Sequence, residues 1–278
     1  MPNEGRPDVQ QIRAVAQWQA RALQPPLRPR VPLACEVLGV IGSVESALLA
    51  ALRLDCLRPG LADGRVGWTV TGSPTDSLAL LALALREAGY VRAWRDEPLA
   101  VRDATGRVVG QVERGVTRLL GIATEAVHLL GLSPDGHHWI QQRAWNKPDD
   151  PGLWDTLVGG MVPAGESVDT ALARECDEEA GLALSQLVDL RPGGWLTVQR
   201  PTPGTPEGYT VERIAWFRAQ VPADVVPVNR DGEVAQFKLM TVDEVCSQFA
   251  EVGFTLEAAL MLQAEGVPVP APQADGGA

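Results

Sequence analysis

The chain of 278 residues has only four cysteines, and their spacing excludes several classes of protein. They are Cys35, Cys56, Cys176 and Cys246. None forms a C-x-x-C pair or a zinc-binding spacing, so we expect neither a zinc site nor a dithiol redox motif. Nothing in the spacing indicates a disulfide framework either, which favours a reducing, cytoplasmic environment over a secreted one.

The sequence also lacks long apolar runs and an excess of positive charge. Its longest apolar run, near residues 78–85, is too short to span a bilayer, and the polar N-terminus lacks the apolar core of a signal peptide. There are 24 Lys and Arg against 35 Asp and Glu, which gives a net charge of −11. We therefore expect no nucleic acid and no membrane as partner, while a local basic pocket for a phosphate stays compatible with this charge.

Apolar residues make up 45 % of the sequence, which is enough for a core, and their periodicity predicts an α/β (α+β) fold in two parts. In the first part we expect helices over residues 8–23, 43–54 and 75–89, a proline-rich connection over 24–31, and strands over 99–102 and 107–112. In the second part we expect strands over 126–132, 138–143, 194–199, 211–219 and 236–240, and helices over 166–180, 241–250 and 256–264, with residues 154–158 running into the loop before the first of these helices.

Residues 160–182, which read GMVPAGESVDTALARECDEEAGL, are the most informative stretch. Good helix formers without an internal Gly or Pro run from residue 166 to about residue 180. Gly181 follows at the place where a helix C-terminal glycine belongs. The segment is therefore predicted to be a loop followed by one helix.

Three carboxylates share one side of this predicted helix. At about 100° per residue, Glu175, Glu178 and Glu179 occupy a single stripe. Like charges at this spacing destabilise a helix, so the pattern indicates a counter-charge. Arg174 offers one, and a hard cation that prefers oxygen ligands offers a larger one. A bare E-x-x-E-E run would more often be a solvated acidic face, but here Glu166, the Arg-Glu pair and the glycines are all in register.

The whole stretch resembles the Nudix box, G-x5-E-x7-R-E-U-x-E-E-x-G-U with U apolar, at every defined position. The resemblance implies an α/β/α sandwich with a mixed sheet over residues 121–266. A smaller α+β N-terminal region over 1–120, whose role the sequence does not reveal, would precede it, and a disordered tail over 267–278 would follow.

The resemblance also implies the roles of the box residues. Glu175, Glu178 and Glu179 would bind Mg²⁺ (or Mn²⁺), and Glu166 and Arg174 would orient these ligands by ion pairs. The chain would turn tightly at Gly160. The cations would neutralise a diphosphate and activate a water that attacks one phosphorus in line. Which glutamate acts as general base varies within the superfamily and stays open.

The implied activity is that of a Mg²⁺-dependent pyrophosphohydrolase, a hydrolase of phosphoric anhydride bonds. It would cleave a small organic diphosphate to the monophosphate and phosphate. Because many relatives dimerise, a homodimer is a further expectation.

Residues around the box are similar to one Nudix subgroup, which is associated with thiamine pyrophosphokinase. The matching positions are Trp139 to Arg143, Lys147, Pro151-Gly152, Asp155 and Gly159-Gly160, with Trp94-Arg95-Asp96-Glu97 upstream and Asp231-Gly232-Glu233-Val234 downstream. Members of this subgroup act on thiamine diphosphate and its oxidised analogues. The resemblance therefore implies a substrate of that kind for this chain.

Five residues outside the box also have an interpretation. Arg143 and Lys147 are interpreted as diphosphate contacts rather than a solvated strand edge, because a guanidinium forks onto phosphate oxygens and an ammonium serves as a point charge. Asp155 is interpreted as orienting the box loop. Glu233 is either a metal ligand or base, or an ordinary acid in a turn. His128, within an apolar run, is interpreted as a core residue rather than a catalyst.

Two other functions stay open. The same chemistry could act on ADP-ribose, on a dinucleotide such as NADH, or on coenzyme A, because specificity is determined by loops that the sequence does not explain. Alternatively, the chain could be a non-catalytic regulator that uses a Nudix fold to bind a diphosphate. The intact box argues against this second alternative.

Overall fold

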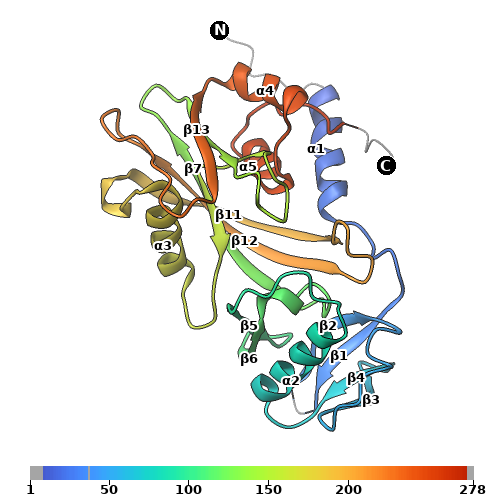
Figure 1. The fold of residues 1–278 in the computed structure, drawn as a ribbon. Coiled ribbons are helices and arrows are strands. Elements are labelled where there is room, and N and C mark those ends of the chain that lie inside the picture. Colours follow the sequence, from blue (N-terminus) through green and yellow to red (C-terminus); the bar gives the residue numbers. More distant parts are fainter. Residues whose placement is uncertain (1–8, 37, 274–278) are drawn as a thin grey trace.

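Helix α2 (Pro74–Glu87) organises the N-terminal part of the molecule, as the computed structural model shows (Figure 1). The structure describes residues 9–36 and 38–273. The helix buries Leu78, Leu81, Ala82 and Leu85, which follow the helical spacing i, i+3, i+4 and i+7. Their partners come from a four-stranded sheet with the order β2-β1-β4-β3 and from the hairpin β5–β6. The strands are β1 (Arg30–Cys35), β2 (Gly39–Glu45), β3 (Leu57–Ala62), β4 (Arg65–Val70), β5 (Pro98–Arg102) and β6 (Val108–Glu113).

This part of the fold confirms some predictions and corrects one. The helix predicted over 75–89 and the strands predicted over 99–102 and 107–112 are present. The helix predicted over 43–54 is wrong, because residues up to Glu45 belong to strand β2 and residues 46–51 form turns. Strand β2 pairs with β1, and the amide of Ser43 donates to the carbonyl of Leu120 at 2.9 Å. These long-range backbone hydrogen bonds override the weak local preference for a helix.

The second part is built on a seven-stranded mixed sheet with the order β11-β12-β7-β8-β13, in which β10 also pairs with β7 and β9 with β8. Strand β12 runs parallel to β7, and the other pairs are antiparallel. The strands are β7 (Thr124–Leu132), β8 (His138–Arg143), β9 (Trp154–Asp155), β10 (Val158–Met161), β11 (Val188–Pro201), β12 (Tyr209–Gln220) and β13 (Val234–Met240). Two 3-10 turns cover Arg114–Val116 and Leu184–Gln186.

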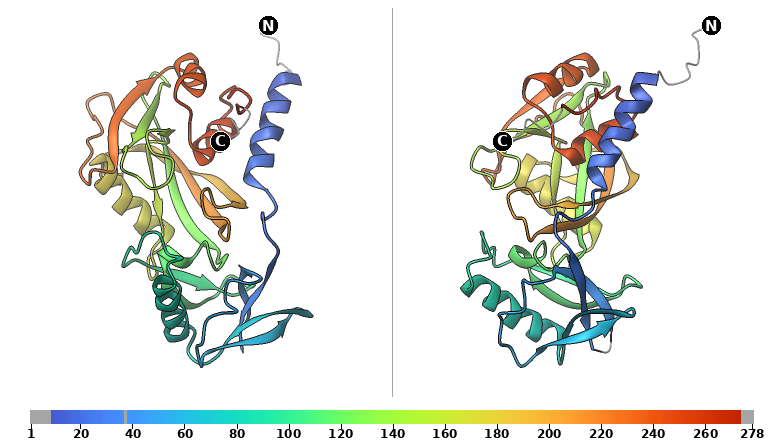
Figure 2. Two further views of the ribbon diagram at one scale, coloured as in Figure 1. Left: turned by 45° about the vertical axis from the view of Figure 1, so that its right-hand side comes forward. Right: turned by 90° about the vertical axis from the view of Figure 1, so that its right-hand side faces the viewer.

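Helices cover both faces of this sheet (Figure 2). Along β7 the side chains alternate: Val127 and Leu129 pack under α3 (Val168–Ala180), while Ala126 and Leu130 face the opposite cluster. That cluster contains α1 (Val9–Ala22), α4 (Val242–Glu251) and α5 (Leu256–Ala264). The predicted α/β/α sandwich with a mixed sheet is confirmed.

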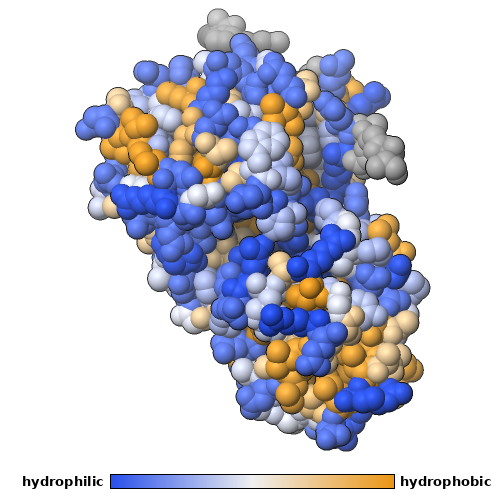
Figure 3. Space-filling model, in the orientation of Figure 1, coloured by the Kyte–Doolittle hydropathy of each residue, from blue (hydrophilic) through white to orange (hydrophobic). Residues whose placement is uncertain are grey.

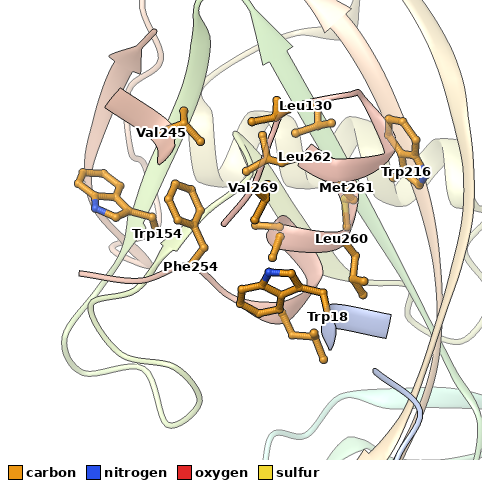
Figure 4. Packing of buried hydrophobic residues seen from close by; sticks show 14 of the residues in the cluster. Trp18, Leu130, Trp154, Trp216, Val245, Phe254, Leu260, Met261, Leu262 and Val269 are labelled. Carbon is orange, nitrogen blue, oxygen red and sulfur yellow. The ribbon is translucent and has the colours of Figure 1, made fainter. Parts of the chain in front are cut away.

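Helix α1 packs with the second part of the chain, although it begins in the first. Trp18 lies against Leu260, Met261 and Val269 (Figure 4), and its ring meets Phe249 edge-on at 5.8 Å. Its Nε1 donates to the carbonyl of Pro270 at 2.8 Å. The boundary predicted at residue 120 therefore does not follow the packing of α1, which lies before residue 120 but packs with the second part.

The C-terminal segment shares this packing. Val267 and Val269 are buried in the same cluster. The disordered tail predicted over 267–278 is therefore wrong for residues 267–273, because apolar side chains of this segment complete the core; residues 274–278 lie outside the described residues. None of the helices in the described ranges is long and apolar enough to cross a membrane.

Replacement of Trp18 by Ala tests the docking of α1. The change removes a buried ring and the hydrogen bond to Pro270, so we expect the free energy of unfolding to fall by about 3–5 kcal/mol. Urea denaturation of the purified chain measures it. Trp145→Ala is the matched control, because this ring is 72 % exposed and its loss should change stability by roughly 0.5 kcal/mol or less. Equal, small effects of the two substitutions would show that α1 is not docked in solution.

Candidate active site

Helix α3 presents the acidic stripe that the sequence predicts. It begins after Ser167, whose hydroxyl accepts from the amide of Thr170 at 3.1 Å, and it ends at Gly181, which adopts the left-handed conformation with φ 63°. Leu172, Cys176 and Ala180 are buried and anchor the helix on the sheet. This anchoring also draws two charged neighbours into the protein, since Glu175 and Glu179 are 9 % and 1 % exposed.

Two glycines of strand β10 allow close packing beside these carboxylates. A Cβ on Gly160 would overlap the carboxyl group of Glu175, and a Cβ on Gly159 would lie 2.5 Å from the ring of His128. The amide of Gly159 donates to Glu179 Oε2 at 2.9 Å. The tight turn predicted at Gly160 is wrong: this residue lies within β10 and pairs with Val127, and its lack of a side chain serves close approach instead.

Arg174 pairs with three glutamates of the box. Its guanidinium contacts Glu166 Oε2 at 3.2 Å, Glu175 Oε1 at 2.9 Å and Glu178 Oε2 at 3.0 Å, and it donates to the carbonyl of Met161 at 3.1 Å. Burial alone would lower the pKa of Arg174, but the neighbouring glutamates, Glu175 first, raise it. The predicted pairing of Glu166 with Arg174 is thus present, and Arg174 joins the box loop to the helix.

Glu179 is the most buried carboxylate of the group. Burial raises its pKa to about 8, and the attraction of Lys147 and the bonds from Gly159 and Gln141 only partly oppose this. The amide of Gln141 donates to Glu179 Oε2 at 3.1 Å, while its own oxygen is a buried acceptor without a partner in the described part of the chain. Burial also raises the pKa of Glu175. For both carboxyl groups, burial thus shifts the pKa more than the nearby positive charges of Arg174 and Lys147 do.

A second acidic group meets Glu179 from outside the helix. Carboxylate oxygens of Glu179, Asp231 and Glu233 lie within 4.8 Å of one another. Lys147 contacts the carboxylate of Glu233, and its Nζ lies 3.8 Å from Glu179 Oε1. The backbone supports this meeting, because the amide of Ala144 donates to the carbonyl of Glu233 at 2.9 Å. The structure thus brings Lys147 and Glu233 to the box helix.

Arg143 and Asp155 form a buried pair at the floor of the site. The side chain of Asp155, which is 2 % exposed, accepts from Thr255 Oγ1 at 3.0 Å and from the amide of Thr156 at 2.8 Å, and it pairs with Arg143 at 3.3 Å. Arg143 also donates to the carbonyl of Asp149. Asp155 therefore joins strand β9, the loop after β8 and the start of α5.

His128 is a buried core residue, as its sequence context indicates. Its Nδ1 lies 2.9 Å from the hydroxyl of Thr156, and burial lowers the pKa of the imidazole. These contacts hold the histidine beside β10 in its neutral form.

A cleft of about 680 Å³ lies between the two parts of the molecule and contains the site. Figure 3 shows mainly hydrophilic residues over this region, with apolar residues gathered on the N-terminal part. The side of the cleft next to the box includes Glu175, Glu178, Arg143, Lys147 and Glu233. The N-terminal part contributes Tyr90, Arg92, Arg95, Arg114 and Arg118, and a third side contains Arg200 and Glu257.

The last two sides were not identified by sequence analysis, because they are assembled from segments far apart in the chain. Only the segment from Trp94 to Glu97 gave a signal, since it matched an upstream motif; Arg95 and Glu97 of this segment line the cleft. Arg200 and Glu257 gave none.

A family model and curated relatives indicate the same family for this part of the chain. The family model of the NUDIX domain matches residues 123–260. Two Arabidopsis thaliana proteins, "Nudix hydrolase 20, chloroplastic" and "Nudix hydrolase 24, chloroplastic", are 30 % and 28 % identical to it; each alignment covers 65 % of this chain and 48 % or 50 % of the relative. The chain thus spans about half the length of these curated relatives. A crystal structure of a Deinococcus radiodurans protein superposes with a TM-score of 0.48 at 21 % identity, over 60 % of this chain and 99 % of that one.

Replacement of Asp155 by Ala tests the buried pair. Arg143 would lose its buried carboxylate partner, so the free energy of unfolding should fall by about 3–5 kcal/mol in a denaturation experiment. The matched control is Asp149→Ala, because Asp149 pairs with Arg118 at a surface where both side chains are more than 40 % exposed. Such a pair contributes about 0–1 kcal/mol. A loss at Asp155 no larger than at Asp149 would contradict this account of the floor.

Proposed function

We propose that this chain, whose residues 123–260 match the NUDIX domain model, is a divalent-cation-dependent pyrophosphohydrolase of small organic diphosphates. It would release the monophosphate and phosphate. One observation carries the proposal: Glu175 and Glu179 are buried beside a large cleft, and burial raises the pKa of both carboxyl groups despite the attraction of Arg174 and Lys147. A solvated acidic surface would not bury these carboxylates, because burial of charge is costly.

The donor atoms fit a hard cation. Carboxylate oxygens are the ligands that Mg²⁺ and Mn²⁺ prefer, and the oxygens of Glu179, Asp231 and Glu233 lie close together. We propose that Glu175, Glu178 and Glu179 would hold Mg²⁺ (or Mn²⁺). Asp231 and Glu233 are positioned to add oxygen ligands from the opposite loop. Lys147 now lies among these oxygens and would be free to turn toward a phosphate.

A bound cation supplies charge neutralisation for the diphosphate and a water of lowered pKa. The side chains of this chain would do the rest. Arg174 fixes the orientation of Glu175 and Glu178 through its ion pairs, with Glu166 behind it. Lys147 and Arg143, which line the cleft beside them, would orient the phosphate oxygens. Glu233 or a box glutamate would accept the proton of the attacking water.

Thiamine diphosphate or one of its oxidised analogues is the substrate that we propose for this site. The subgroup motifs around the box support this choice. Two of them, the segment containing Arg95 and Glu97 and the loop containing Glu233, contribute to the same cleft. We further propose that the N-terminal part, up to about residue 120, serves as the second wall of this cleft. The cytoplasmic location and the homodimer stay predictions.

Glu179→Gln tests the reaction. Loss of one carboxylate ligand should lower kcat by more than about 100-fold with Mg²⁺, beyond the loss typical of outer-shell changes. The melting temperature should stay equal or rise, because a buried charge is replaced by a neutral amide. Phosphate release is measured with thiamine diphosphate, its oxy-analogue, ADP-ribose, NADH, coenzyme A and nucleoside triphosphates.

Asp177→Asn is the matched control, since Asp177 lies on the same helix, is 60 % exposed at its side chain and pairs with Arg230. It should keep full activity. Cleavage of ADP-ribose or a dinucleotide alone would keep the reaction and reject the thiamine-type substrate. Tight binding of a diphosphate without any metal-dependent cleavage would favour a non-catalytic binder, and full activity of the Glu179 variant would reject the proposed site.

Gly160→Ala tests the packing of helix and strand. The new methyl group would displace the carboxylate of Glu175, so we expect kcat to fall about 10- to 100-fold. Gly136→Ala is a control for the loss of a glycine elsewhere, because a Cβ there meets no atom within 4 Å, although its φ of 82° makes it a strained position. Activity retained by the Gly160 variant would show that this close approach is not needed.

A further inference from the structure

Glu257 and Arg200 meet at the side of the cleft formed by α5 and β11. Glu257 is in the first turn of α5, after the N-cap Thr255, and Arg200 is near the end of β11. Both residues line the cleft. Their closest atoms, Glu257 Oε1 and Arg200 Nη2, lie 3.8 Å apart, which is an ion pair but too long for a hydrogen bond.

Each member of this pair has unsatisfied hydrogen-bonding capacity. The side chain of Glu257 is 15 % exposed; its carboxylate accepts from its own backbone amide, and among the described residues no side chain donates a hydrogen bond to it. Burial raises its pKa to about 7 despite the attraction of Arg200. Arg200 Nε is a buried donor without a partner in the same part of the chain. Buried polar groups without partners destabilise the folded protein, so such a pair beside a cavity calls for a ligand.

The surroundings of the pair are polar rather than apolar. The hydroxyls of Thr202 and Thr210 bond each other at 3.1 Å, and Thr124 Oγ1 lies 3.4 Å from Glu212 Oε1. These residues line the same cleft and satisfy one another, whereas Glu257 and Arg200 do not. A ligand in the cleft would therefore meet the carboxylate of Glu257 next to the partly exposed guanidinium of Arg200.

We propose that Glu257 and Arg200 determine specificity by recognising the organic part of the substrate. Arg200 donates to an acceptor and Glu257 accepts from the donor beside it. An amidine- or amide-type edge of a nitrogen heterocycle presents these two groups side by side. This inference rests on the proposed function, since it assigns recognition of the organic group to the other end of the cleft in which the diphosphate would be cleaved.

Arg143 connects the two ends electrostatically. Burial lowers the pKa of its guanidinium, but nearby carboxylates, Asp155 first and both Glu179 and Glu257 among them, raise it above the ordinary value. Asp155, the partner of Arg143, also accepts a hydrogen bond from Thr255, the N-cap of the helix that carries Glu257, so a chain of contacts links Arg143 to the start of this helix. One ligand can then place its diphosphate at the box and its ring at Glu257.

The test compares substrates with and without such an edge in the full chain with Mg²⁺. Thiamine diphosphate carries an amino edge, its oxy-analogue a keto edge, ADP-ribose an adenine edge, and methyl diphosphate none. We consider a substrate that is cleaved and that carries such a heterocycle edge. Glu257→Gln and Arg200→Leu should each raise the KM for this substrate at least about tenfold more than they raise the KM for methyl diphosphate. The comparison of amino and keto compounds shows which edge is preferred.

Glu265→Gln is the matched control, because Glu265 follows the same helix and pairs with Arg218 at 3.3 Å away from the cleft. Glu265→Gln should leave unchanged the ratio of the KM for the heterocyclic substrate to the KM for methyl diphosphate. Equal loss on all substrates, or a loss in kcat alone, would overturn the inference. If the wild-type chain cleaves nothing, the proposed function fails. Calorimetric binding of thiamine, oxythiamine and adenosine then decides: weaker binding by the Glu257 variant supports the subsite, and no binding or no difference rejects it.

Discussion

The burial of two carboxylates of helix α3 against strand β10, which has glycine at the points of contact, is the constraint on which the rest of the site depends. Glu175 and Glu179 are drawn inward because Leu172, Cys176 and Ala180 of the same helix anchor it on the sheet. Strand β10 must therefore lack a side chain at Gly160, where it would overlap Glu175, and a side chain at Gly159 would overlap His128. The result is a concentration of acidic oxygen in a place with little solvent, which a divalent cation would stabilise.

The other elements position groups around this acidic centre. Arg174 holds the box loop to the helix, and Asp155 joins β9, Arg143 and the start of α5. The N-terminal part, whose core is built on α2, closes the opposite side of the cleft. The two proposed functions of the cleft, diphosphate cleavage at one side and recognition of a ring at the other, follow from this division.

Local patterns predicted the elements that bury one regular face. The box helix, its end at Gly181, and the strands with alternating apolar residues such as β7 agree with the sequence, because period and capping are local properties. Contacts between distant segments could not be predicted. The pairing of Ser43 with Leu120 turned an expected helix into a strand, α1 docked on α5, and Arg200 met Glu257 without any sequence motif.

The central claim is that the buried carboxylates of α3 form a cation site, and calorimetric titration of Mn²⁺ into the full chain tests it most directly. The account predicts saturable binding to the wild type that is strongly weakened when Glu175 and Glu179 are both replaced by Gln, while the fold is retained. Equal Mn²⁺ binding by the two proteins would contradict it, because the cation would then be held elsewhere on this acidic chain.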